Sequence, residues 1–387
     1  MDINERKAVS VTCSPGLATH LAAELQAFGF AATNMHRGSV MIKASFLDCM
    51  KLNYHLRTAY SVLYQLGEFR CGSTDTLYKQ INRIAWEKII DPSEYFTITS
   101  NVDTHAVDNT MFANLKAKDA IVDRIMAKRQ SRPDSGPMRD AVVINLFWNN
   151  DKAWIYLNTS GEKLSDRNYR KMPHKAPLRE TLAAGIIMAT EYDGSQNLVL
   201  PMCGSGTLAI EAAMIAKKFP PASLRSNFGF KHVIDYDERR FKEIRRLAKA
   251  SAKPTNPIGK IIATDIDPRA IEAAKQNALT AGVNHMIDFN VCDFAETQLP
   301  APPDTPGIII MNPEYGQRLG ETEQLQKDYK RIGEFLKQKC PGWTAYIFSG
   351  NKELTASLGL KTSSKQVFFN GKIECRLLKY ELYKGSR

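Results

Sequence analysis

The chain has 387 residues, of which 43% are hydrophobic and 24% are charged, and its formal net charge is +11. No run approaches the roughly 18 apolar residues of a membrane-spanning helix, no secretory leader pattern opens the chain, and the seven cysteines form no CxxC pair. We therefore expect a soluble, cytoplasmic protein of two or three domains, with reduced thiols and no metal site.

The first 70 residues alternate strands with amphipathic helices. The predicted elements are a strand, a helix, a strand and a helix, at residues 8–11, 17–29, 37–44 and 45–60. The second helix is predicted because Phe46, Met50 and Tyr54 recur at four-residue spacing, which places them on one helix face. We place this small α+β domain at residues 1–68.

A second α+β domain follows. Its predicted elements are a helix, a strand, a helix and the two strands of a hairpin, at residues 76–90, 95–102, 114–130, 141–150 and 152–161. Pro92 ends the first helix, and Asn149, Asn150 and Asp151 form the turn of the hairpin. We place this domain at residues 69–165.

From about residue 176 the pattern changes, because apolar strands now alternate with helices. Strands are predicted at residues 197–201, 260–265, 286–291, 307–312, 344–349, 365–370 and 375–383, with helices from residues 206 and 268 and near 323–338. This alternation predicts a doubly wound, mostly parallel α/β sheet at residues 166–387. The last two strands are close in sequence, so at least one should run antiparallel.

Positive charge is concentrated in two segments. Residues 163–179 contain six Lys or Arg residues and one acidic residue, and residues 217–253 contain eleven and four. Such clusters favour a polyanionic partner, although a solvated helix face produces the same pattern. The rings of Tyr169 and His174 in the first segment can stack on bases. The candidate nucleic-acid-binding residues are Arg167, Tyr169, Arg170, Lys171 and Lys175.

The strand at residues 197–201 runs into a glycine-rich turn, Pro-Met-Cys-Gly-Ser-Gly. Gly204 and Gly206 permit a tight turn and close approach of a ligand, and the N–H groups of the next helix point at that turn. The same residues satisfy the GxGxxG/A dinucleotide-binding pattern, which by itself is weak evidence for a dinucleotide site. In nicotinamide-binding folds an acidic residue follows this pattern about 20 residues later. The acid at the next strand end, Asp265, comes much later because the basic insertion intervenes.

Three aspartates follow strands of this sheet. Asp265 can accept both ribose hydroxyls of a nucleoside, whereas Asp267 precedes Pro268 and is expected to cap a helix. Asp293 can accept an adenine amino group, with Phe294 beside the ring, and an ordinary strand-end aspartate remains the alternative.

The stretch Met-Asn-Pro-Glu-Tyr-Gly ends the fourth strand. The Asn312 side-chain oxygen and the Pro313 carbonyl can accept from an exocyclic amine, and Tyr315 can stack on the ring that carries it. Because the lone pair of such an amine is delocalised, two fixed acceptors would orient it for in-line attack on a sulfonium methyl.

These motifs together resemble class I S-adenosylmethionine-dependent methyltransferases with an Asn-Pro-Pro-Tyr motif. The ordered set PMCGSGTLAIEAAMIA, ATDIDPRAIEAAKQNA, CDF, MNPEYGQRLG and FNGKIECRLLKYEL is similar to the bacterial 23S rRNA guanine-N2 methyltransferases. Residues 69–165 resemble a THUMP RNA-binding domain, and residues 1–68 resemble the ferredoxin-like domain that accompanies it.

The resemblance implies a Rossmann-like domain with a seven-stranded sheet, S-adenosylmethionine as cofactor and a guanine N2 of 23S rRNA as methyl acceptor. It assigns catalysis to Asn312, Pro313 and Tyr315. It assigns cofactor binding to Pro201, Cys203, Gly204, Ser205, Gly206, Asp265, Asp293, Phe294 and Asn312. Some members carry a second methyltransferase domain, whereas we expect this sequence to contain a single methyltransferase domain.

Two positions depart from the family pattern. Glu314 replaces the second proline, and Asn168 stands where the family tends to have glycine. The first proline is intact, so we expect catalysis to survive, and Asn168 affects only a local turn. A tRNA guanine-N2 methyltransferase and a non-catalytic RNA-binding ribosome assembly factor remain alternatives, and a nicotinamide oxidoreductase is disfavoured because MNPEYG has no function there.

Overall fold

The computed structural model describes residues 3–172, 177–252, 259–300, 307–315 and 322–383. The chain forms two compact units, each assembled from separate stretches of sequence. The N-terminal unit comprises residues 1–13, 21–166 and 225–247, and the C-terminal unit comprises residues 14–20, 167–224 and 248–387. Among the described residues, no helix is both long and apolar enough to cross a membrane.

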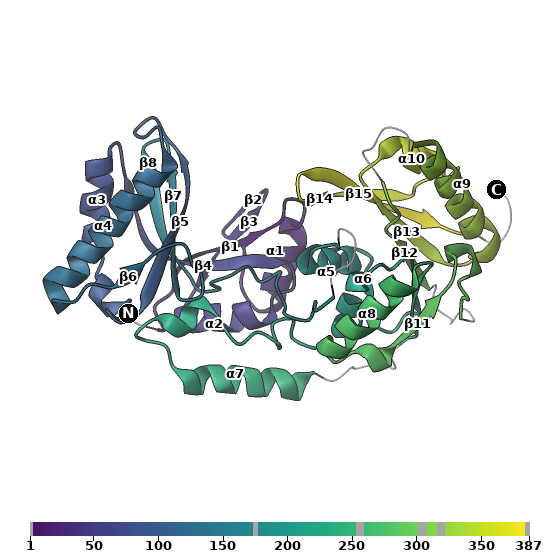
Figure 1. Cartoon of the computed structure of the whole chain (residues 1–387), viewed down its shortest axis with the longest axis horizontal. Coiled ribbons are helices and arrows are strands. Elements are labelled where there is room, and N and C mark those ends of the chain that lie inside the picture. Colours follow the sequence, from purple (N-terminus) through teal and green to yellow (C-terminus); the bar gives the residue numbers. More distant parts are fainter. Residues whose placement is uncertain (1–2, 173–176, 253–258, 301–306, 316–321, 384–387) are drawn as a thin grey trace. The chain divides into compact units, whose positions relative to one another are not determined.

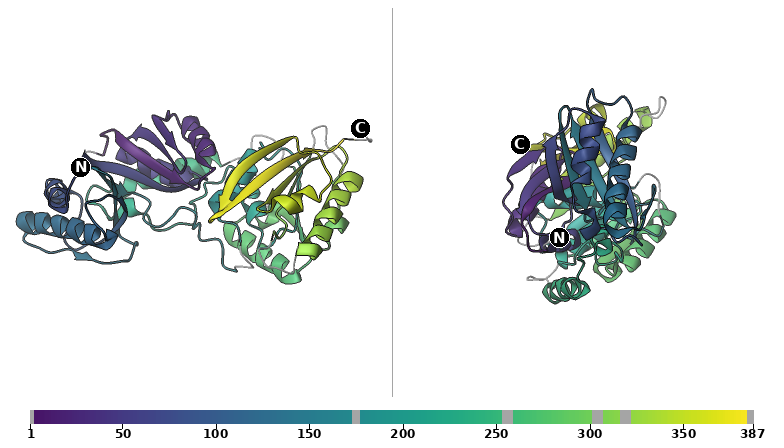
Figure 2. Two further views of the ribbon diagram at one scale, coloured as in Figure 1. Left: turned by 90° about the horizontal axis from the view of Figure 1, so that it is seen from above. Right: turned by 90° about the vertical axis from the view of Figure 1, so that its left-hand side faces the viewer.

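One eight-stranded sheet forms the core of the N-terminal unit (Figures 1 and 2). In spatial order its strands are β2 (Asn34–His36), β3 (Ser39–Ala44), β1 (Lys7–Cys13), β4 (Ala59–Arg70), β8 (Lys152–Asn158), β7 (Val142–Asn149), β5 (Tyr95–Asp103) and β6 (Asp134–Ser135). Strand β4 pairs antiparallel with β1 on one side and with β8 on the other. The two predicted α+β domains therefore share one sheet.

The helical elements before residue 130 are α1 (Ala18–Ala27), α2 (Phe46–His55), α3 (Thr74–Asn82), the 3₁₀ turn η1 (Trp86–Lys88) and α4 (Thr110–Arg129). Polar caps begin α2, α3 and α4, at Ser45, Ser73 and Asn109. Ser45 and Asp48 form a capping box at the start of α2, and Phe46, Met50 and Tyr54, which were predicted to share one face of this helix, are all buried. The predicted helix over residues 45–60 was too long, because Leu56 is already extended and β4 follows.

The C-terminal unit contains a seven-stranded sheet, as predicted. In spatial order its strands are β11 (Ile287–Val291), β10 (Ile261–Asp265), β9 (Leu198–Pro201), β12 (Ile308–Met311), β13 (Thr344–Ser349), β15 (Ile373–Glu381) and β14 (Ser364–Asn370). The strands from β11 to β13 are parallel, whereas β15 runs antiparallel to both β13 and β14. Figure 2 shows β14 and β15, in yellow, along one side of this sheet.

Helices pack around this sheet and leave its carboxyl edge to loops (Figure 1). They are α5 (Glu180–Ala189), α6 (Thr207–Ala216), α8 (Pro268–Ala281), α9 (Thr322–Lys339) and α10 (Lys352–Ala356). The strand order reverses between β9 and β12, and ligands of open α/β sheets bind outside the carboxyl ends of strands at such a point.

The connection between α6 and β10 contains a long insertion. It includes the 3₁₀ turn η2 (Gly229–His232) and the helix α7 (Glu238–Ser251). Residues 225–247 belong to the N-terminal unit, although the sequence on both sides belongs to the C-terminal unit.

Candidate active site

The glycine-rich loop after β9 has a left-handed backbone at three of its positions. The φ angles of Met202, Gly204 and Gly206 are 60°, 54° and 81°. A Cβ at position 206 would lie 2.8 Å from the Cβ of Ala274, so only glycine fits against α8 there. A Cβ at position 204 would meet no atom within 4 Å, so the loop is open on that side. Met202 carries a strained backbone, a feature that concentrates at functional sites.

Asp265 lies at the end of β10 and holds this loop. One carboxylate oxygen accepts from the Gly204 N–H at 2.9 Å, and the other accepts from the Asp267 N–H at 3.0 Å. An ionised carboxylate has about four acceptor positions, so Asp265 keeps capacity for hydroxyl donors. Asp267 accepts from the Arg269 N–H and caps α8 with Pro268 in its first turn, as predicted.

Ile266 lies between these aspartates, and no sequence pattern predicted a function for it. Its side chain is 70% exposed, although it is large and apolar. An exposed isoleucine beside a carboxylate at a strand end offers a surface for a flat, apolar group. Its position between two aspartates was the one feature of the sequence that could have indicated such a function.

Asp293 and Phe294 follow β11 and contact α9. Both oxygens of Asp293 lie 3.0 Å from the Arg331 guanidinium, and one also accepts from the Ala295 N–H. Phe294 is 6% exposed and packs in the core against Phe335, with Arg331 over its ring at 4.9 Å. The structure therefore gives the Phe294 ring a packing function rather than an open position beside a ligand.

The end of β12 presents an unpaired acceptor. The Oδ1 atom of Asn312 is buried and has no hydrogen-bond partner among the described residues. Pro313 is buried beside it, and Glu314 is exposed. A buried amide oxygen without a donor costs roughly 1–3 kcal/mol, which a ligand N–H can offset. The geometry therefore fits a site that accepts a hydrogen bond from a bound amine.

Tyr315 is held by residues of the last two strands. Its hydroxyl accepts from the Asn370 Nδ2 at 2.9 Å and lies 3.8 Å from the Cys375 Sγ. Its ring lies over Gly350, where an added Cβ would approach it to 3.1 Å. Burial raises the pKa of Tyr315 to about 12, so the phenol is neutral at ordinary pH. Asn370 and Cys375 stand in the quoted motif FNGKIECRLLKYEL, but the sequence alone gave them no function.

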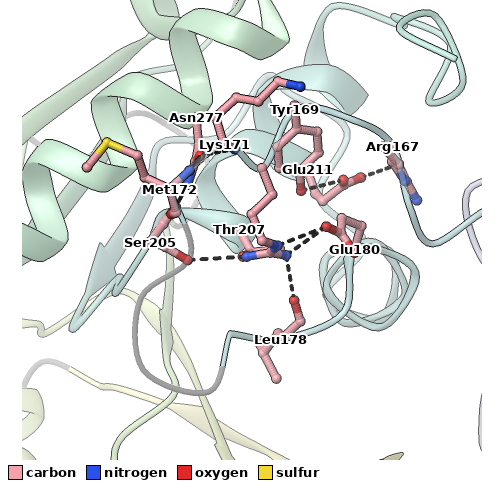
Figure 3. A network of polar contacts seen from close by, with 11 residues as sticks. Arg167, Tyr169, Lys171, Met172, Leu178, Glu180, Ser205, Thr207, Glu211 and Asn277 are labelled. Atoms are coloured by element: carbon pink, nitrogen blue, oxygen red, sulfur yellow. Dashed lines mark hydrogen bonds and ion pairs between the residues drawn. The ribbon is translucent and has the colours of Figure 1, made fainter.

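Residues 167–172, here called the strap, are attached to the glycine-rich loop and to the helices around it by polar contacts (Figure 3). Arg167 forms an ion pair with Glu211 of α6, and the Tyr169 hydroxyl donates to the same carboxylate at 3.0 Å. Arg167 and Tyr169 are each 1% exposed. This burial corrects the expectation that they face a nucleic acid, because neither side chain can reach a phosphate or a base from the core.

Arg170 connects the strap to two helix starts. It donates to the Ser205 and Thr207 hydroxyls at 3.3 and 3.0 Å, and to Glu180 at 2.8 Å. Its guanidinium therefore bonds both to Ser205 of the glycine-rich loop and to Glu180 in the first turn of α5, two residues that Figure 3 labels. Arg170 therefore fixes the orientation of the loop instead of projecting into solvent.

Asn277 of α8 completes the attachment. Its side-chain oxygen accepts from the Lys171 and Met172 N–H groups at 2.9 and 3.0 Å, and its Nδ2 donates to the Ser205 carbonyl at 3.2 Å. Of the candidate nucleic-acid-binding residues, Lys171 alone among those described is exposed; Lys175, with its neighbour His174, lies outside the described residues.

Asn168 adopts a φ of 63° within the strap. Asparagine tolerates this left-handed conformation better than most non-glycine residues. The turn is therefore preserved although asparagine stands where the family tends to have glycine. Among the described residues, no group of three His, Cys, Asp or Glu side chains is arranged to bind a metal.

Comparison with known families matches three parts of the chain. Residues 9–63 match the RlmL ferredoxin-like domain, and residues 71–158 match the THUMP domain. Residues 167–379 match the family described as RMKL-like, methyltransferase domain. The order along the chain is the one that the sequence predicted.

Individual relatives match nearly the whole chain. A ribosomal RNA large subunit methyltransferase K/L from Psychromonas ingrahamii is 36% identical over 96% of this chain and 50% of that protein. A putative RNA methyltransferase from Synechocystis is 32% identical over 96% of both chains. The solved structure of a possible methylase from Clostridium difficile 630 has a TM-score of 0.88 at 30% identity, covering 99% of this chain and 100% of that one. The chain thus spans about half the length of the K/L relatives it matches.

Proposed function

The chain belongs to the RMKL-like methyltransferase-domain family, and we propose that it transfers a methyl group from S-adenosylmethionine to the exocyclic N2 amine of a guanine in 23S rRNA. The THUMP match and the RNA methyltransferase relatives support an RNA substrate. The polar groups at the end of β12 support an amine as the methyl acceptor.

The loop after β9 and the end of β10 fit the cofactor. Asp265 would accept the ribose hydroxyls, the open side of Gly204 admits a ligand close to the backbone, and Ile266 offers an apolar surface to a base. Asp293 remains a proposed acceptor for the adenine amine, alongside its ion pair with Arg331. S-adenosylmethionine would supply an electrophilic methyl group on a sulfonium.

The unpaired oxygen of Asn312 is the observation on which the proposal rests. The Asn312 oxygen and the Pro313 carbonyl would each accept one N–H of the guanine amine, which orients its lone pair. Tyr315, as a neutral phenol, would stack on the base. A stacked or paired guanine cannot present N2 to a buried oxygen, so the base must leave the helix at a cost of a few kcal/mol.

The test is methyl transfer from labelled S-adenosylmethionine to unmodified 23S rRNA, 16S rRNA and tRNA, followed by nucleoside analysis. We expect N2-methylguanosine from 23S rRNA alone. Asn312→Ala should lower kcat by about 10²–10³-fold, the cost of losing one fixed polar contact to the reacting group. Its fold should persist, because this oxygen has no hydrogen-bond partner to lose among the described residues.

The other outcomes separate the alternatives. Label in tRNA would support the proposed methyl transfer but would show that the substrate is tRNA and not 23S rRNA. Bound cofactor with no label in any RNA, including assembling ribosomal particles, would favour a non-catalytic assembly factor. Full activity of Asn312→Ala would show that the amine is held elsewhere.

A further inference from the structure

The insertion between α6 and β10 is fixed to the N-terminal unit by an aromatic cluster. The rings of Phe228 and Phe230 stack at 4.9 Å, and Phe241 of α7 meets them at 5.6 and 5.0 Å. Tyr54 of α2 meets Phe241 edge-on at 6.0 Å. These four side chains are at most 5% exposed. The start of α7 therefore has a defined position on this unit.

A buried arginine anchors the beginning of the insertion. Arg225 is 7% exposed and donates to the Lys163 and Asp166 carbonyls, both at 2.8 Å. The Phe230 N–H donates to the Thr159 carbonyl at 2.9 Å. Backbone acceptors immediately after β8 thus hold the insertion beside the segment that follows the THUMP match.

The outward side of α7 carries a stripe of positive charge. Phe241 and Ala248 are buried on the opposite side. The exposed members of the stripe are spaced so that each has a neighbour three or four residues away on the same side of the helix, and they are Arg239, Lys242, Arg245, Arg246 and Lys249. At 1.5 Å per residue the stripe is about 15 Å long.

Ion pairs within the helix neutralise only part of this stripe. Glu238 lies 3.7 Å from Lys242, and Glu243 lies 2.6 Å from Arg246. Within the described part of the chain, Arg239, Arg245 and Lys249 form no ion pair. Arg245 and Lys249 are four residues apart, and like charges at that spacing cost a few tenths of a kcal/mol. The unpaired cations of the stripe therefore repel one another within the helix.

We propose that this stripe is a docking surface for the sugar-phosphate backbone of the substrate RNA. The inference rests on the proposed function and adds the element that contacts the RNA. The first basic cluster turns Arg167 and Arg170 inward to Glu211 and Glu180, whereas α7 presents its cations to solvent. Phosphates are the complementary partner for a fixed row of cations, and backbone contacts position an RNA without reading its sequence.

The experiment compares two triple variants of the full chain. Arg239, Arg245 and Lys249 are replaced by Gln in the first, and Lys330, Lys337 and Lys339 of α9, also exposed, are replaced by Gln as the matched control. Binding to transcribed 23S rRNA is measured over a series of salt concentrations. Each lost phosphate contact lowers the slope of log K against log salt by about 0.7–0.9, so the α7 variant should lose about 2–3 slope units.

We expect the α7 variant to bind RNA at least about tenfold more weakly at low salt and the control to match the wild type. Cofactor affinity and thermal unfolding, measured in parallel, should be the same for all three proteins. An unchanged salt slope in the α7 variant overturns the docking surface while leaving the proposed function intact. Salt-independent or absent RNA binding by the wild type itself would instead refute the RNA substrate.

Discussion

At the scale of single residues, the site depends on partners that lie far along the chain. Tyr315 follows β12, but the donor to its hydroxyl is Asn370 at the end of β14. The raised pKa of about 12 keeps this phenol neutral, so Asn370 controls where the ring lies rather than its charge. The hairpin of β14 and β15 therefore contributes to the proposed base-stacking position.

Asn370→Ala removes this donor and frees the Tyr315 ring to move. We expect kcat for methyl transfer to fall about 10–100-fold, because small misplacements of a reacting group cost rates of that order. Cofactor affinity should not change. Tyr315→Phe removes the acceptor, so adding Asn370→Ala to it should cost little more, and additive losses in this double-mutant cycle would show that the two residues act independently.

At the scale of elements, an ion pair joins η1 to α4 in the THUMP-matching region. Arg124 donates to both oxygens of Glu87, at 2.9 and 2.8 Å. These bonds lower the pKa of Glu87 to about 2. Because an unfolded glutamate has a pKa near 4.3, the unfolded state takes up the proton first as pH falls. The contribution of the pair is therefore complete above about pH 5 and is lost as pH falls towards 2.

Glu87→Gln should therefore reduce the free energy of unfolding by about 1 kcal/mol at pH 7 and by less at pH 3. Urea unfolding of both proteins across this pH range measures the difference. Glu68→Gln, which breaks a more exposed pair with Lys152, is the matched control and should have a smaller effect. A difference that stays constant between pH 5 and pH 3 would mean that the charge of Glu87 is not what stabilises the pair.

The central strands β9, β10 and β12 of the C-terminal sheet could be predicted because they are short, largely apolar runs that end at Pro201, at Asp265 and just before Asn312. The shared sheet of the N-terminal unit could not, because the two partners of β4 lie at residues 7–13 and 152–158. The positions of Asp265 and Asn312 followed from strand ends. The burial of Phe294 could not be predicted in this way, because it depends on packing against α9, which a local sequence pattern does not contain.

At the scale of the whole molecule, the chain leaves the N-terminal unit at residue 166 and immediately becomes the strap. In sequence, the basic residues there resemble a binding site for a polyanion. In the structure, Arg167 forms an ion pair with Glu211, 44 residues away, and Arg170 forms one with Glu180. Charge counts cannot distinguish a buried ion pair from an exposed cation. The strap consequently joins the exit from the N-terminal unit to the loop that we propose binds the cofactor.

Arg170→Met tests whether the strap positions that loop. Methionine keeps the apolar stem but removes the donors to Ser205, Thr207 and Glu180, so we expect the cofactor Kd to rise at least about tenfold and stability to fall by about 3 kcal/mol. Adding Glu180→Gln removes the charge left unpaired and should restore stability without restoring affinity. Lys171→Met is the control, because its backbone N–H, and not its exposed side chain, bonds to Asn277. If calorimetry shows that cofactor affinity recovers together with stability in the double variant, Arg170 serves the ion pair alone and does not orient the loop.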